Sequence, residues 1–95
     1  MLVHIYNDNA HIGAVAMGDF DAGKQRASAS VITRLGHKDT VIAQSAAYSI
    51  SRATGKLACV VAGVHIDAIT AEEIDEVLQK TDMLVVELLA KLGTP

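Results

Sequence analysis

Three histidines stand near glycines at the expected ends of strands and helices, in the runs HIG (11–13), GHKD (36–39) and GVHID (63–67). An imidazole changes protonation near neutral pH and is a common metal ligand, so such positions suit proton transfer, ligand orientation or metal binding. One of these runs alone would carry little information. Their repetition predicts that the fold brings His11, His37 and His65 to a common pocket.

The polar pair His65 and Asp67 follows the most apolar stretch of the chain. In an extended strand, residues two positions apart point to the same side, so the two side chains are expected to work together. A carboxylate beside an imidazole can fix its tautomer, raise its basicity, or join it in binding a cation or orienting a ligand. The alternative is that Asp67 caps the following turn while His65 bonds a backbone carbonyl.

The other two histidines also have neighbours that suit a ligand. Gly13, two positions after His11, would leave bare backbone where a flat or phosphorylated ligand can approach, although a bulge or a tight strand crossing would need the same glycine. Lys38 follows His37 just before a predicted helix, whose free N–H groups form an anion site to which the lysine adds a positive charge. A solvated loop is the alternative there.

Metal binding and catalysis are two further uses open to these side chains. His11, His37 and His65, with Asp67 as an oxygen ligand, match the preferences of Zn, Fe, Ni or Cu, although no pair has the spacing of a specific metal motif. A His–Asp pair can also act as acid and base. The chain has no Gly-x-Ser-x-Gly, Walker or Gly-x-Gly-x-x-Gly motif, and its only cysteine, Cys59, reads as a small core residue.

Composition predicts one domain, residues 1–95, that shares faces with other copies of itself. Hydrophobic residues make up 51% of the chain, yet there is no Trp, one Phe and two Tyr, so the core must be built from small and branched aliphatic side chains. A chain of 95 residues has too little volume to bury all of them, which predicts a homo-oligomer.

Charge and hydropathy argue against other classes of protein. The net charge is −3 and the lysines and arginines are scattered, which argues against nucleic-acid binding. No apolar run approaches the roughly 20 residues that span a bilayer, and the first residues lack the layout of a signal peptide. We therefore expect a cytoplasmic protein with no membrane partner.

The hydrophobic pattern predicts an α+β fold, an α/β sandwich in β-β-β-α-β-α order with a mixed sheet covered by two helices. Strands are expected at 2–6, 11–17, 27–35 and 57–63. The turn residues at 7–9 predict a hairpin between the first two strands, and the glycines and charges at 18–26 predict a loop. The strand at 57–63 is apolar on both faces, which predicts a central strand covered above and below.

Both helices have recognisable ends. The first is expected to start at Asp39 or Thr40 and to end near Gly55, and its stripe of small residues suits close packing on the sheet. The second begins at a capping box formed by Thr70 and Glu73 and ends at 93.

The runs HIGAVAM (11–17), GHKD (36–39) and VVAGVHIDAITAEEIDEV (60–77) resemble those of the LpdD-like domain family of prenylated-flavin chaperones. The likeness covers nearly the whole chain. It implies a fold like that of proteasome-assembly chaperones. It also implies binding of prenylated FMN or FMN, and delivery to or protection for a UbiD-type decarboxylase.

By position, the resemblance implies a cofactor site made of eight residues of this chain: His11, Gly13, Gly36, His37, Lys38, Gly63, His65 and Asp67. A divalent metal, if one is bound, would use His11, His37 and His65. The chain departs from the family pattern at 7–10, where a glycine-rich turn is usual, and at Asp39, where Glu is common.

Three interpretations follow from the sequence. The first is a non-catalytic, homo-oligomeric carrier of a flavin, in which Lys38 and the following helix start neutralise the phosphate. The second is a small metal-dependent enzyme that uses His65 as acid and base with Asp67 orienting it. The third is a structural assembly factor whose histidines only satisfy backbone groups.

Overall fold

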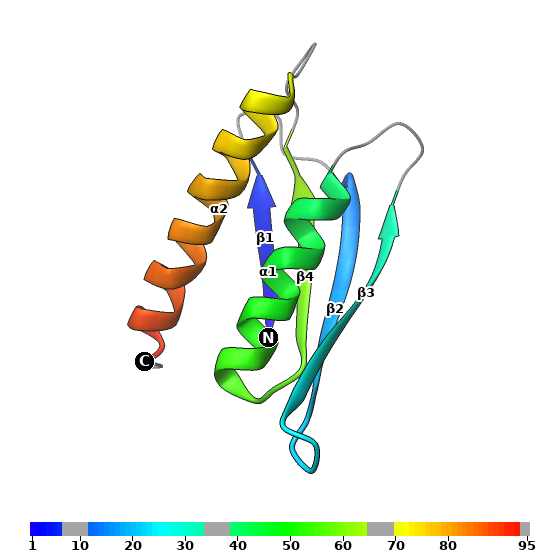
Figure 1. Cartoon of the computed structure of the whole chain (residues 1–95), viewed down its shortest axis with the longest axis vertical. Coiled ribbons are helices and arrows are strands. Elements are labelled where there is room, and N and C mark those ends of the chain that lie inside the picture. Colours follow the sequence, from blue (N-terminus) through cyan, green and yellow to red (C-terminus); the bar gives the residue numbers. More distant parts are fainter. Residues whose placement is uncertain (7–11, 34–38, 65–69, 94–95) are drawn as a thin grey trace.

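The computed structural model describes residues 1–6, 12–33, 39–64 and 70–93 (Figure 1). Within these ranges the elements follow the order β1 (Leu2–Tyr6), β2 (Ala14–Asp21), β3 (Arg26–Thr33), α1 (Asp39–Thr54), β4 (Ala58–Gly63) and α2 (Ala71–Lys91). The predicted α+β class and the order β-β-β-α-β-α are confirmed. Both helices lie on the same side of a mixed sheet, with α1 across its middle and α2 beside it (Figure 1).

The strands are arranged in the order β1-β4-β2-β3. β1 runs parallel to β4, while β2 is antiparallel to both β4 and β3. The predicted hairpin between the first two strands is therefore wrong, because β4 lies between them. The turn signal at 7–9 is local, whereas pairing depends on which strand can be buried in the middle of the sheet. The sequence of β4, ACVVAG, has no polar side chain, which suits this central position.

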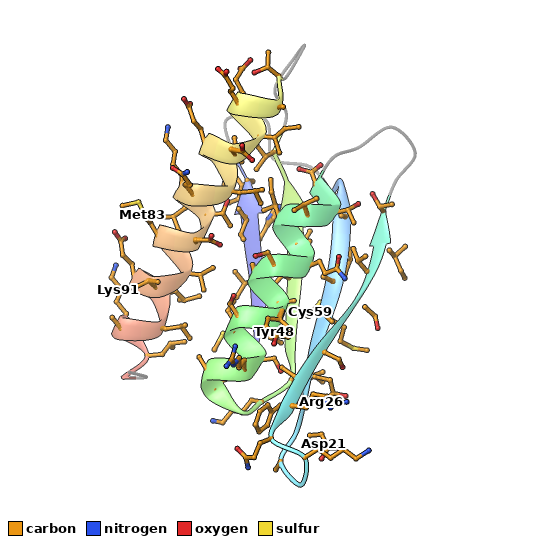
Figure 2. All side chains as sticks on the ribbon, viewed as in Figure 1. Asp21, Arg26, Tyr48, Cys59, Met83 and Lys91 are labelled. Carbon is orange, nitrogen blue, oxygen red and sulfur yellow. The ribbon has the colours of Figure 1, made fainter. Side chains whose placement is uncertain are left out.

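The β2–β3 hairpin also differs from the prediction, because strand replaces most of the expected loop at 18–26. β2 begins at Ala14 and continues to Asp21, and only four residues, 22–25, form the turn. The Oδ1 atom of Asp21 accepts hydrogen bonds from the N–H groups of Gly23 and Lys24, at 3.0 and 3.2 Å. Asp21 and Arg26 lie at this tip of the molecule in Figure 2. A tight charged turn thus carries the polar residues that the sequence assigned to a longer loop.

The helix-covered side of the sheet contains the core. Gly18 lies in β2 where an added Cβ would overlap the carbonyl oxygen of Ala47, so this glycine permits close approach of α1. The predicted close packing of α1 is confirmed at Ile42, Ala46 and Ile50, which are buried, whereas Val41, predicted for the same side, is 50% exposed. α2 packs against the core through Val85 and Leu89.

The predicted helix ends are confirmed. Thr70 Oγ1 accepts a hydrogen bond from the Glu73 N–H, and the Glu73 carboxylate accepts one from the Thr70 N–H, both at 3.2 Å. Gly55 and Gly93 have φ of 66° and 76°, values that favour glycine and end each helix.

The opposite side of the sheet does not match the sequence prediction. β4 was expected to be covered above and below, but no element of the described ranges covers the face turned away from the helices. Cys59 and Val61 of β4 are only half-buried there. Within the described ranges, the predicted cover is therefore found on one side of β4 only.

Candidate functional site

Asp39 connects the start of α1 to two strands at one end of the sheet. It is the first residue of the helix and only 2% exposed. Its Oδ1 atom accepts a 2.8 Å hydrogen bond from the N–H of Val64, directly after β4. Its Oδ2 atom fills the space above Gly13, where an added Cβ would overlap the carboxylate. We refer to Gly13, Asp39 and Val64 as the Asp39 junction.

Backbone pairing brings further element ends to the same place. The N–H of Gly13 donates a 2.8 Å hydrogen bond to the carbonyl oxygen of Ala62. Ala14, the first residue of β2, is opposite Ala62 of β4 and Thr33 at the end of β3. The junction therefore lies at the end of the sheet where β3 and β4 finish and where β2 and α1 begin.

A separate apolar groove runs between the edge strand β1 and α2. Its lining consists of aliphatic side chains and one aromatic pair: Val3, His4, Ile5, Tyr6, Leu84, Val85 and Leu88. The rings of His4 and Tyr6 lie 4.8 Å apart between centroids, tilted by 42°. The groove volume is about 220 Å³. This is below the roughly 300–1,000 Å³ of typical small-molecule pockets, so the groove can enclose only part of a cofactor.

The comparison with known families identifies the chain. Its residues 1–93 match the family described as prenylated flavin chaperone LpdD-like domain. The chain belongs to this family. The match includes every helix and strand from β1 to α2, and the resemblance noted in the sequence is confirmed. No curated protein matches the chain significantly.

Two of the eight residues that the family motifs imply are among those the structure describes, namely Gly13 and Gly63. Gly63 is buried and pairs with Tyr6 across β4 and β1. The other six lie outside the described residues: His11, Gly36, His37, Lys38, His65 and Asp67. Their role in binding stays a prediction.

The Asp39 junction gives Gly13 a structural reason for lacking a side chain. The sequence offered a close-lying ligand or a tight crossing of the backbone, and here a carboxylate of the same chain occupies that space. The prediction that Gly13 contacts a cofactor remains untested. Any such contact would have to involve its backbone or the face not covered by Asp39.

Asp39 itself was predicted only as a helix cap. An acidic residue at a helix start is a common sequence pattern, because a carboxylate is stabilised by the N-terminal end of the helix dipole. The burial of Asp39 and its bond to Val64, 25 positions away, had no local signal. The only hint was its place at the end of the GHKD run.

The described residues also bear on metal binding and membranes. Among residues 1–6, 12–33, 39–64 and 70–93, no three His, Cys, Asp or Glu side chains gather as a metal site would require. The three histidines proposed as ligands lie outside these ranges, so that prediction is not tested. In the same part of the chain, neither α1 nor α2 combines the length and apolar character needed to cross a bilayer.

Proposed function

We propose that the protein is a non-catalytic cytoplasmic carrier of prenylated FMN, or of FMN, and that it supplies a UbiD-type decarboxylase. The observation that carries this proposal is the family match over residues 1–93, which covers the complete fold rather than one motif. A chaperone of this family acts on a flavin that another protein uses. The partner is therefore an enzyme that takes up the cofactor.

The Asp39 junction supports a shared site for the three histidines. His11 precedes Gly13 by two positions, His37 precedes Asp39 by two, and His65 directly follows Val64. Successive Cα atoms are 3.8 Å apart, so two positions of chain reach at most about 7 Å. In this proposal the three histidines share one site at the junction end of the sheet. In this site His65 and Asp67 would orient the polar edges of the flavin ring.

The charges of the helix starts limit where a flavin phosphate can bind. The capping box already uses the N–H of Glu73 in the first turn of α2, and Glu72 and Glu73 place negative charge there. α1 starts with the carboxylate of Asp39. A phosphate therefore needs a cation at the junction end, and Lys38, directly before Asp39, supplies it in this proposal.

We further propose that the carrier works as a homo-oligomer. The aliphatic excess of the sequence predicts it, and the described chain leaves large apolar side chains exposed, among them Leu2, Met17 and Ile32. A neighbouring copy could also shield the flavin ring, because the chain itself has few aromatic side chains to stack on it.

Flavin binding by purified protein tests the carrier function. A native mass spectrum of protein isolated from cells should show a flavin of the expected mass, and titration with prenylated FMN or FMN should change the flavin absorbance. His65→Ala should weaken retention at least tenfold with little change in the unfolding midpoint. Gln79→Ala, at an exposed position in α2, is the control.

The outcomes separate the parts of this proposal. Equal affinity in wild type and His65→Ala would refute the site, while absence of binding to either flavin would refute the carrier function. A stoichiometric metal by elemental analysis, lost in His65→Ala, would instead favour the metal-dependent enzyme.

A further inference from the structure

The side of the sheet that no described element covers carries apolar side chains on all four strands. We call it the open face, and its apolar members are Leu2, Tyr6, Val15, Met17, Ile32, Cys59 and Val61. An antiparallel sheet that faces water normally alternates polar residues on that side. Here the large apolar side chains of the open face are strongly exposed: Ile32 79%, Leu2 73%, Tyr6 59% and Met17 52%.

The strand register joins these side chains into continuous rows. One row crosses the sheet from β3 to β1 through Ile32, Val15, Val61 and His4. The neighbouring row crosses through Ser30, Met17, Cys59 and Leu2. His4 is the sole titratable group in these rows besides the thiol. An exposed apolar patch of this kind is typical of an interaction site rather than of a solvated surface.

The charged residues of the open face gather at one end. Asp19, Asp21 and Arg26 lie next to the β2–β3 turn, and Figure 2 shows Asp21 and Arg26 at that tip. The two rows therefore form an apolar area without Asp, Glu, Lys or Arg, with charged residues at its β2–β3 end, and a lack of such charges is typical of the core of protein–protein interfaces.

The size of the open face approaches that of a stable dimer interface. Strands of 5, 8, 8 and 6 residues present about 400 Å² of flat area per copy, at roughly 3.3 Å per residue and 4.8 Å between strands. Two copies would thus bury about 800 Å² before the relief of the side chains is counted. Protruding side chains raise this toward the roughly 1,200–2,000 Å² of stable interfaces.

We infer that the open face is the interface of a homodimer, in which two sheets pack face to face and the helices lie outside. A twofold interface must be complementary to itself, and an uncharged centre avoids like charges opposing each other. Two sheets can pack in this way about 10 Å apart. A client enzyme would bind only transiently and would leave this apolar surface exposed to water between encounters. A second copy of the chain can cover it permanently. A second copy would complete the two-sided cover that the sequence of β4 requires.

Substitution of one methionine on each side of the molecule tests this inference, which specifies the oligomer of the proposed function. Met17→Lys places a charge in the centre of the open face. Met83→Lys makes the same change on the side of α2 turned away from the sheet, where Met83 is 64% exposed (Figure 2). Sedimentation without flavin should give twice the 10.0 kDa chain mass for wild type and Met83→Lys, and the single-chain mass for Met17→Lys.

Two further measurements exclude misfolding as the cause. Ile32→Lys alters a side chain that is already exposed in the single chain, so it should give a folded monomer with an unchanged circular dichroism spectrum. Cys59, the only cysteine, should react with a maleimide at least tenfold faster in either monomeric variant than in wild type.

The inference is overturned if wild type is a monomer at about 100 µM, or if Met83→Lys dissociates while Met17→Lys and Ile32→Lys remain dimeric. These results are independent of flavin binding. A dimer that binds no flavin would refute the carrier function and support the dimer interface. A monomer that binds flavin would support the carrier function and refute the dimer interface.

Discussion

The N–H of Val64 donates a 2.8 Å hydrogen bond to Oδ1 of Asp39, which fixes the exit of β4 to the first turn of α1. The same carboxylate lies against Gly13 at the start of β2. One buried side chain therefore sets the relative positions of three elements. The histidines of the family motifs lie one or two positions along the sequence from Gly13, Asp39 and Val64.

Asp39→Ala should destabilise the fold by about 1–3 kcal/mol, because the N–H of Val64 would lose its partner in a poorly hydrated position. Asp39→Asn keeps an acceptor oxygen and should cost less. Urea unfolding followed by circular dichroism measures both. Asp82→Ala, at an exposed position in α2, is the control and should lie within about 0.5 kcal/mol of wild type. If Asp39→Ala unfolds at the wild-type midpoint, the bond contributes nothing to stability.

Gly13→Ala should also lower stability, by about 1–3 kcal/mol, since the new methyl group would overlap the Asp39 carboxylate. Gly23→Ala is the matched control, because its Cβ would be 3.4 Å from Oδ1 of Asp21, an ordinary contact. Thermal or urea unfolding provides the comparison.

A double variant identifies the cause of the Gly13→Ala effect. If the methyl group acts by displacing the carboxylate, the Gly13→Ala substitution should cost less in an Asp39→Ala background than in wild type. Strictly additive losses would show that the two residues do not act on each other.

The parts of the fold that sequence predicted are those governed by neighbouring residues. The Thr70–Glu73 capping box needs only residues three positions apart, and the ends at Gly55 and Gly93 need only a residue that tolerates positive φ. The same holds for the order of elements, because periodicity within 5 to 20 residues distinguishes strand from helix.

The errors arose where distant residues compete. The turn residues after Tyr6 favour a hairpin locally, yet β1 pairs with β4, more than 50 positions away, because β4 is the strand best suited to the centre of the sheet. Gly18 was assigned to a loop because glycine is common in turns, whereas its missing side chain makes room for α1. Local patterns could not reveal either relationship.

For the candidate site, too, the sequence indicated which residues to consider but not the contact between them. Three residues of the motif runs, Gly13, Asp39 and Gly63, lie at one end of the sheet, while the binding role of the runs stays a prediction. The contact that joins them was not predicted, because a buried bond between Asp39 and a backbone N–H 25 positions away leaves no periodic trace.

Lys38 is expected to bind the phosphate of the flavin rather than its ring. Lys38→Ala should therefore weaken FMN binding about tenfold, equivalent to about 1.4 kcal/mol, and the loss should shrink as salt is raised, because a charge-assisted contact is screened. Riboflavin, which has the same ring and no phosphate, should bind wild type and Lys38→Ala equally. Lys56→Ala, an exposed lysine beyond the other end of α1, controls for the change in net charge. An equal loss of affinity for FMN and riboflavin would mean that Lys38 supports the structure of the site and that another group binds the phosphate.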